Sequence, residues 1–198
     1  MKMNLPNKLT ILRMILLPFV MVSIIFPIFP GDIIWRLVAA ALFGITSLTD
    51  MLDGKIARKY NLVTDFGKFL DPLADKMLVI GTMIAIMIRF GSNSLFLCVF
   101  GWALFIVTMR ELAITSLRMI AASKAGKVIA AAWLGKVKTV TQIVCLLTVL
   151  LEGVICAIVQ IDTHMILSYL TTVVMLVMTL WSGLDYFFKY LPLLKEEE

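Results

Sequence analysis

The chemically most informative part of the sequence is the stretch TDMLDGKIARKYNLVTDFGKFLDPLADK, which runs from Thr49 to Lys76. It contains five aspartates, although 61% of the whole chain is hydrophobic. An unpaired carboxylate is costly at the edge of a bilayer, so acids in such a position are candidates for function. The spacing of these aspartates therefore decides which chemistry the chain could perform.

Helical spacing puts the first two aspartates on one face. Asp50 and Asp53 are three positions apart, Gly54 and Ala57 fall on the same face, and Arg58 lies at its edge. Residues with little or no side chain let a ligand approach the helix backbone. This face therefore offers two carboxylates, an open surface and a guanidinium.

A second acidic stripe follows a turn expected near residues 59–63. Gly67, Asp71 and Asp75 are spaced four apart and line one face of a helix, whereas Asp65 lies off this face and is expected to be a cap or surface acid. Two adjacent antiparallel helices would bring four carboxylates together, and these cannot all remain ionised without cations. Oxygen ligands suit Mg²⁺ or Mn²⁺, and two such ions can clamp a phosphoryl group and its leaving oxygen.

The rest of the chain predicts an all-α, polytopic membrane protein with six transmembrane helices in one domain covering residues 1–198. A spanning helix needs about 20 mostly apolar residues. The six candidate segments are residues 14–29, 34–51, 73–90, 95–117, 140–161 and 165–188. A short interfacial helix is expected at residues 3–13, with Leu9, Ile11 and Leu12 in lipid and Lys8 and Arg13 in water.

Positive charge predicts the orientation. With the N-terminus inside, 16 of the 18 lysines and arginines fall in cytoplasmic segments, and Arg36 and Arg89 alone lie outside. Lysine and arginine accumulate in cytoplasmic loops, so both termini and the aspartate stretch are expected to face the cytoplasm from the cell (inner) membrane. The net charge of +5 then faces anionic headgroups and anionic substrates, and no nucleic acid partner is expected.

The aspartate pattern resembles the signature of the CDP-alcohol phosphotransferases. The pattern is Asp50-x2-Asp53-Gly54-x2-Ala57-Arg58-x8-Gly67-x3-Asp71-x3-Asp75, and all eight of its fixed positions match. The resemblance implies an enzyme that transfers a phosphatidyl group from CDP-diacylglycerol to an alcohol and releases CMP. It also implies a six-helix membrane fold and a homodimer.

The same resemblance implies roles for individual residues. Asp50, Asp53, Asp71 and Asp75 would hold two Mg²⁺ or Mn²⁺ ions, and Asp75 would also accept the proton of the acceptor. The CDP-diacylglycerol site would be lined by Gly54, Ala57, Arg58, Thr64 and Gly67, with Asn7 and Thr10 of "PNKLT" approaching the nucleotide.

The acceptor is inferred from the remaining cationic residues. Arg110 and Arg118 are eight positions apart on one side of the fourth helix, Lys136 and Lys138 open the fifth, and Lys59 ends the second. Such a cluster favours an acceptor that carries its own phosphate, although orientation in the membrane alone would also explain these charges. The phrases "PNKLTILR", "TDFGKFLDPLADK", "RE" at 110–111 and "AWLGKVKT" resemble family members that use glycerol 3-phosphate.

Other functions remain open from the sequence alone. The acceptor could be inositol phosphate, serine or phosphatidylglycerol, and membrane prenyltransferases also bind diphosphates through paired aspartates. A divalent-cation transporter would need acids that continue to the outer half of the bilayer, but no acid lies midway through any span apart from Asp185 and Glu152, which lie near span ends.

Overall fold

A computed structural model describes residues 4–26, 31–59, 65–125 and 133–195, and at some helix ends it describes the backbone alone. These residues form six α-helices and no strand, as the sequence predicts. The helices are α1 (Leu5–Ile25), α2 (Asp32–Lys59), α3 (Asp65–Phe90), α4 (Ser94–Ala125), α5 (Trp133–Val159) and α6 (Ile166–Lys195).

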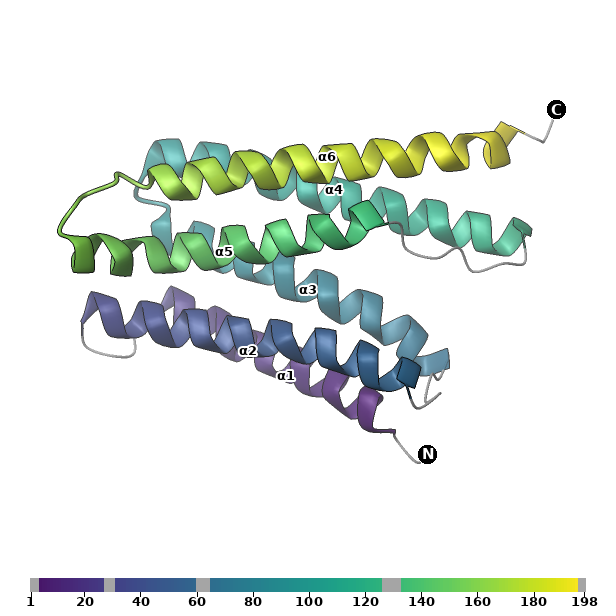
Figure 1. The fold of residues 1–198 in the computed structure, drawn as a ribbon, viewed down its shortest axis with the longest axis horizontal. Helices are drawn as coiled ribbons and strands as arrows, with labels where there is room; N and C mark the ends of the chain where they lie inside the picture. Colours follow the sequence, from purple (N-terminus) through teal and green to yellow (C-terminus); the bar gives the residue numbers. More distant parts are fainter. Residues whose placement is uncertain (1–3, 27–30, 60–64, 126–132, 196–198) are drawn as a thin grey trace.

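Successive helices run in opposite directions along one bundle (Figure 1). The starts of α1, α3 and α5 therefore meet the ends of α2, α4 and α6 at one end, called the motif end here because both aspartate helices reach it. The opposite end, called the distal end, carries the connections from α3 to α4 and from α5 to α6. Leu5 and Lys195, the outermost helical residues of the chain, both lie at the motif end.

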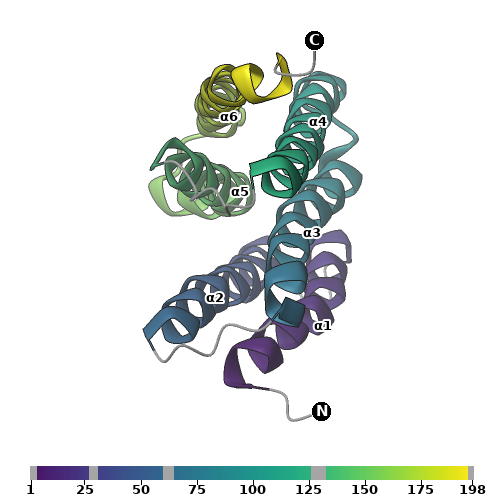
Figure 2. The same ribbon diagram turned by 90° about the vertical axis from the view of Figure 1, so that its right-hand side faces the viewer.

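α3 lies between α4 and α1 when the bundle is viewed along the helices (Figure 2). It packs against α1, α2, α4 and α5, while α6 packs against α4 and α5. The contact with α1 is close: a Cβ atom at Gly81 would lie 3.1 Å from Leu17 Cδ1. Small residues of this kind let membrane helices approach one another. α1 therefore packs tightly against α3, the helix that carries the second acidic stripe.

The surface between the two ends is apolar. Large hydrophobic side chains such as Phe19, Trp102, Ile158 and Trp181 are exposed on the outside of the bundle. Within the described residues, five helices contain a segment long and apolar enough to cross a membrane, and α3 runs among them over 26 residues. The chain is therefore a multi-pass membrane protein.

The N-terminal region differs from the sequence expectation. α1 begins at Leu5, with Pro6 in its first turn, and continues without a break to Ile25, so residues 5–13 are its first turns rather than a separate interfacial helix. The expectation that Arg13 lies in water is wrong, because this residue is only 1% exposed. It shares one helix face with the buried residues Thr10, Leu17 and Val20, so the bundle covers it.

Candidate active site

The first half of the aspartate signature lies on the last turns of α2, which is helical without interruption through Lys59. The predicted arrangement of Asp50, Asp53, Gly54 and Ala57 on one face therefore has the helical backbone that it requires. The side chains of these residues, and those of Arg58 and Lys59, lie outside the described part of the structure.

The second half lies on the first turns of α3, which begins at Asp65. Gly67, Asp71 and Asp75 are all helical, so the predicted four-residue stripe is present in the backbone. Gly67 is buried and Asp75 is half-buried, whereas the side chain of Asp71 and the whole of Thr64 lie outside the description. α2 and α3 are in contact, and the last turns of α2 and the first turns of α3 both lie at the motif end.

Two of the predicted nucleotide-site residues lie on α1 at the same end. Asn7 and Thr10 are both buried, on the face of α1 that turns toward α2 and α3. Polar side chains are rarely buried in the apolar part of a bundle unless other groups contact them. Their burial beside the signature helices agrees with the expected approach of α1 to the site.

Two of the predicted phosphate-binding residues meet at a buried carboxylate. Glu111 on α4 is 7% exposed, and its Oε1 accepts hydrogen bonds from Arg110 Nη1 at 3.2 Å and from Lys138 Nζ on α5. Both are ion pairs between groups removed from water, where charges interact more strongly than at a surface. Glu111 therefore collects cations from two helices at one point.

The guanidinium of Arg110 is held from the other side by α6. Its Nη2 donates to Ser182 Oγ at 2.6 Å, and its Cζ lies 5.9 Å from the ring centroid of Tyr186. A Cβ atom at Gly183 would lie 3.3 Å from Arg110 Cγ, so the missing side chain at this position makes room for the arginine. Arg110 is thus fixed by contacts to both α4 and α6.

A further cation comes from α3, the helix that carries Asp75. Lys76 Nζ donates to Thr115 Oγ1 on α4, and that hydroxyl donates to the carbonyl oxygen of Glu111 at 2.7 Å. Lys76 also interacts electrostatically with Glu111, Lys138 and the neighbouring Asp75. The cationic cluster, defined here as Lys76, Arg110 and Lys138 with Glu111, therefore adjoins the second half of the signature.

The other predicted phosphate-binding residues are more peripheral. Arg118 and Lys136 are exposed near the motif end, and Arg118 also interacts electrostatically with Lys76. The sequence alone does not single out Lys76 or Glu111 as site residues: Lys76 is one of the 16 cationic residues that indicate orientation, and Glu111 is the second residue of the phrase "RE" at 110–111. The signal available was an acid in the apolar fourth segment, directly after an arginine.

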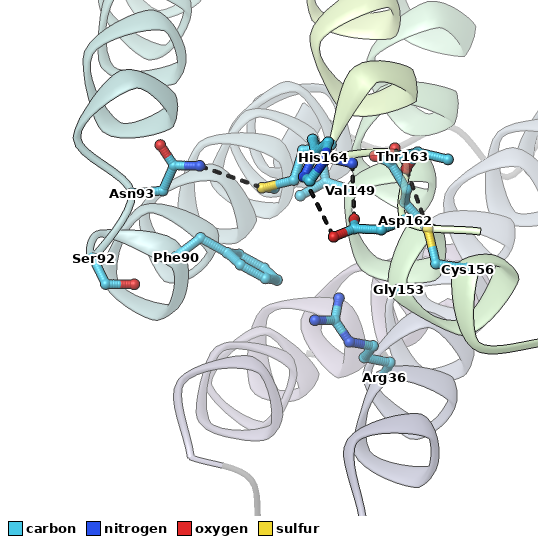
Figure 3. Close-up of a pocket in the computed structure, with 12 residues that line it drawn as sticks. Arg36, Phe90, Ser92, Asn93, Val149, Gly153, Cys156, Asp162, Thr163 and His164 are labelled. Carbon is cyan, nitrogen blue, oxygen red and sulfur yellow. Dashed lines mark hydrogen bonds and ion pairs between the residues drawn. The ribbon is translucent and has the colours of Figure 1, made fainter. Parts of the chain in front are cut away.

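The distal end contains a cavity of about 320 Å³ (Figure 3). Arg36, Phe90, Asn93, Asp162 and His164 are among its lining residues. Its charged groups are engaged with protein partners: Arg36 Nε donates to Asp32 at 2.8 Å, and Asp162 Oδ2 lies 3.3 Å from His164 Nδ1. This arrangement joins the loops of the distal end and lies far along the bundle from the signature.

Glu152, the acid considered for an ion path, is bound to the start of α6. Its carboxylate accepts the backbone N–H groups of Leu167 and Ser168 at 3.0 and 2.9 Å and the hydroxyls of Thr163 and Ser168. The first N–H groups of a helix have no partner within the helix, and Glu152 supplies one. Asp185, the other such acid, pairs with Lys189 at 2.7 Å. These contacts are structural and give no support to a cation path.

Comparison with known proteins identifies the relatives of this chain. Residues 3–182 match the family described as CDP-alcohol phosphatidyltransferase. A protein of Bacillus subtilis (strain 168), named CDP-diacylglycerol--glycerol-3-phosphate 3-phosphatidyltransferase, is 42% identical over 158 residues, which are 76% of this chain and 78% of the relative. Proteins of the same name from Salmonella choleraesuis and Escherichia coli (strain K12) are each 40% identical over 152 residues, 74% of this chain and 76% of the relative.

Proposed function

Since this chain belongs to the CDP-alcohol phosphatidyltransferase family, we propose that it transfers the phosphatidyl group of CDP-diacylglycerol to glycerol 3-phosphate. The products are phosphatidylglycerophosphate and CMP, an early step in making an anionic phospholipid. Relatives that are 40–42% identical over about three quarters of the chain are named for this reaction. The observation that carries the choice of acceptor is the partly buried cationic cluster, which includes Lys76 next to Asp75 on α3.

The metal site is assigned to Asp50, Asp53, Asp71 and Asp75. All four lie on helical backbone at the end of α2 and the start of α3, which supports this assignment, and they offer only oxygen donors, which suits Mg²⁺ or Mn²⁺ better than softer metals. Two ions bound there would neutralise the diphosphate and stabilise the departing CMP.

The chain's own residues then bind, orient and deprotonate. Asp75 accepts the proton of the acceptor hydroxyl. At the same time the hydroxyl oxygen bonds to the phosphorus of the phosphatidyl group, and the bond between that phosphorus and CMP breaks. General-base assistance of this kind contributes about 10²–10⁴-fold. Arg58 holds the diphosphate, since a planar guanidinium can donate two hydrogen bonds to one phosphate.

The nucleotide end of the substrate is assigned to residues from three segments. Gly54, Ala57 and Gly67 leave the helix backbones open to the ligand, while Thr64 offers a hydroxyl. Asn7 and Thr10 of α1 complete the site, and their burial at the motif end supports this role.

The membrane arrangement follows from the same assignments. The motif end faces the cytoplasm, because 16 of 18 cationic residues fall in segments on that side. The diacylglycerol tails of the substrate remain in the bilayer, next to the exposed apolar surface. The protein acts as a single domain over residues 1–198 and as a homodimer.

The test is CMP release by the purified protein with CDP-diacylglycerol, Mg²⁺ or Mn²⁺ and one acceptor at a time. Glycerol 3-phosphate should release CMP, whereas inositol phosphate, serine and phosphatidylglycerol should not. Equal turnover with serine would refute the choice of acceptor. Failure to release CMP from CDP-diacylglycerol with any acceptor would refute the reaction itself.

A further inference from the structure

Glu111 has an unusual set of partners for an acid inside a membrane bundle. One oxygen, Oε1, receives both Arg110 and Lys138, which come from different helices. In the described residues, α4 and α5 do not pack closely through their backbones, so the long side chain of Lys138 spans the distance to Glu111. The position of the Lys138 ammonium therefore depends on this carboxylate.

The cluster around Glu111 also has an excess of positive charge. Lys76, Arg110 and Lys138 bring three cations to a single carboxylate, because Asp75 is assigned to the metal site. Two positive charges remain, which match the two negative charges of a phosphate monoester. Without Glu111 the buried Lys138 and the partly buried Arg110 and Lys76 would repel one another and separate, since charges interact strongly out of water.

We propose that Glu111 is a positioning residue that holds Lys138 and Arg110 at the spacing needed to bind the phosphate of the acceptor. This role rests on the proposed function and adds a residue that touches no reacting atom. Arg110 is already fixed by Ser182, so the greater effect of Glu111 is on Lys138. The site then distinguishes a phosphorylated alcohol from a neutral one by balancing charge.

The first test is Glu111→Gln, which keeps the size of the side chain and an oxygen acceptor but removes the charge. The expected result is an increase of about tenfold in the KM for glycerol 3-phosphate, the equivalent of one charged hydrogen bond. The kcat should change less than about twofold, and the KM for CDP-diacylglycerol should stay the same.

Glu152→Gln is the matched control, because Glu152 is an equally buried acid on α5 at the distal end. It should lower the Tm and leave both KM values unchanged. If Glu111→Gln behaves in the same way, lowering the Tm with no change in the KM for glycerol 3-phosphate, Glu111 is structural and the proposal is wrong.

A double-mutant cycle with Lys138→Gln tests the mechanism of the effect. If Glu111 acts by placing Lys138, the variant carrying both changes should have the same KM for glycerol 3-phosphate as Lys138→Gln alone. Effects that multiply would show that Glu111 acts independently, against the proposal. The double variant removes one charge of each sign, so it remains informative if Glu111→Gln alone does not fold.

Inorganic phosphate separates this proposal from the proposed function. In metal-free protein it should raise the Tm of the wild type more than that of Glu111→Gln, whichever alcohol the enzyme uses. If the wild type binds phosphate in this way but releases no CMP, the proposed reaction is refuted while the proposed role of Glu111 in anion binding is supported. Equal Tm shifts in the two proteins would refute the role of Glu111.

Discussion

The two ends of the bundle each bury a glutamate, and the two residues have opposite partners. At the motif end Glu111 binds the cationic side chains of Arg110 and Lys138. At the distal end Glu152 binds backbone N–H groups and hydroxyls that belong to the start of α6. Backbone groups at a helix start must keep a partner, whereas an ammonium or guanidinium group has further N–H donors that can bind an anion while Glu111 holds it in place. The partners of a buried acid, rather than its burial, therefore indicate function.

Asp75→Asn gives the largest expected difference between the two ends. Loss of the proton acceptor and of a metal ligand should reduce CMP release by at least about 10²-fold, with little change in Tm. Asp162→Asn at the distal end is the control, because Asp162 is an exposed acid in a loop and should leave turnover unchanged. Comparable turnover in the two variants would contradict the assignment of catalysis to the motif end.

Glu152→Ala should have the reverse effect, on stability rather than on activity. It leaves buried N–H and hydroxyl groups without their acceptor, at a cost of about 1–3 kcal/mol in the free energy of unfolding. Thermal unfolding in detergent measures the loss, and kcat and KM should match the wild type. A change in the KM for glycerol 3-phosphate would show that the distal end influences substrate binding at the motif end, against this account.

Gly153→Ala should destabilise the distal end by a smaller amount. A Cβ atom there would lie 2.6 Å from Arg36 Cζ, so the guanidinium must move from its place beside Trp35 and Asp32. Forcing an extra methyl group into a packed site costs about 1–3 kcal/mol, and the flexible arginine keeps the cost near the lower limit. Gly44→Ala is the control, since nothing lies within 4 Å of its Cβ position; an equal loss of Tm in both would contradict this account.

Arg118→Ala should have the smallest effect. Arg118 is exposed near the motif end, so solvent weakens its attraction for the acceptor phosphate, and the KM for glycerol 3-phosphate should rise about two- to fivefold. Lys189→Ala, an exposed lysine on α6 toward the same end, should leave that KM unchanged. An unchanged KM in Arg118→Ala would remove this residue from the site.

The sequence predicts the helices well because their apolar segments are long and the turns between them are short. The boundaries of α2 and α3 around the signature also follow from it, since Asp50 to Lys59 and Asp65 to Asp75 carry a helical spacing. The sequence does not predict that α1 is continuous, because a positively charged residue such as Arg13 normally marks the edge of a membrane. Only the packing of α1 against α3 shows that the bundle buries this residue.

The cationic cluster could be predicted only in part. Arg110 and Lys138 were identified as candidates from their charge, but the fourth and fifth helices carry no pattern that pairs them through Glu111. Lys76 was hidden among the orientation charges, because its contact with Thr115 joins residues 39 positions apart. Contacts between segments that are distant in the sequence depend on how the helices pack, so the spacing of residues within one helix does not predict them.

The central claim is that metal held by Asp50, Asp53, Asp71 and Asp75 at the motif end drives transfer from CDP-diacylglycerol. The most direct measurement is CMP release from CDP-diacylglycerol and glycerol 3-phosphate after exhaustive chelation, followed by return of Mg²⁺ or Mn²⁺. Turnover of the wild type should disappear on chelation and recover when either ion is returned. The Asp71→Asn variant should show no turnover with either ion. Full turnover in the chelated wild type would contradict the claim.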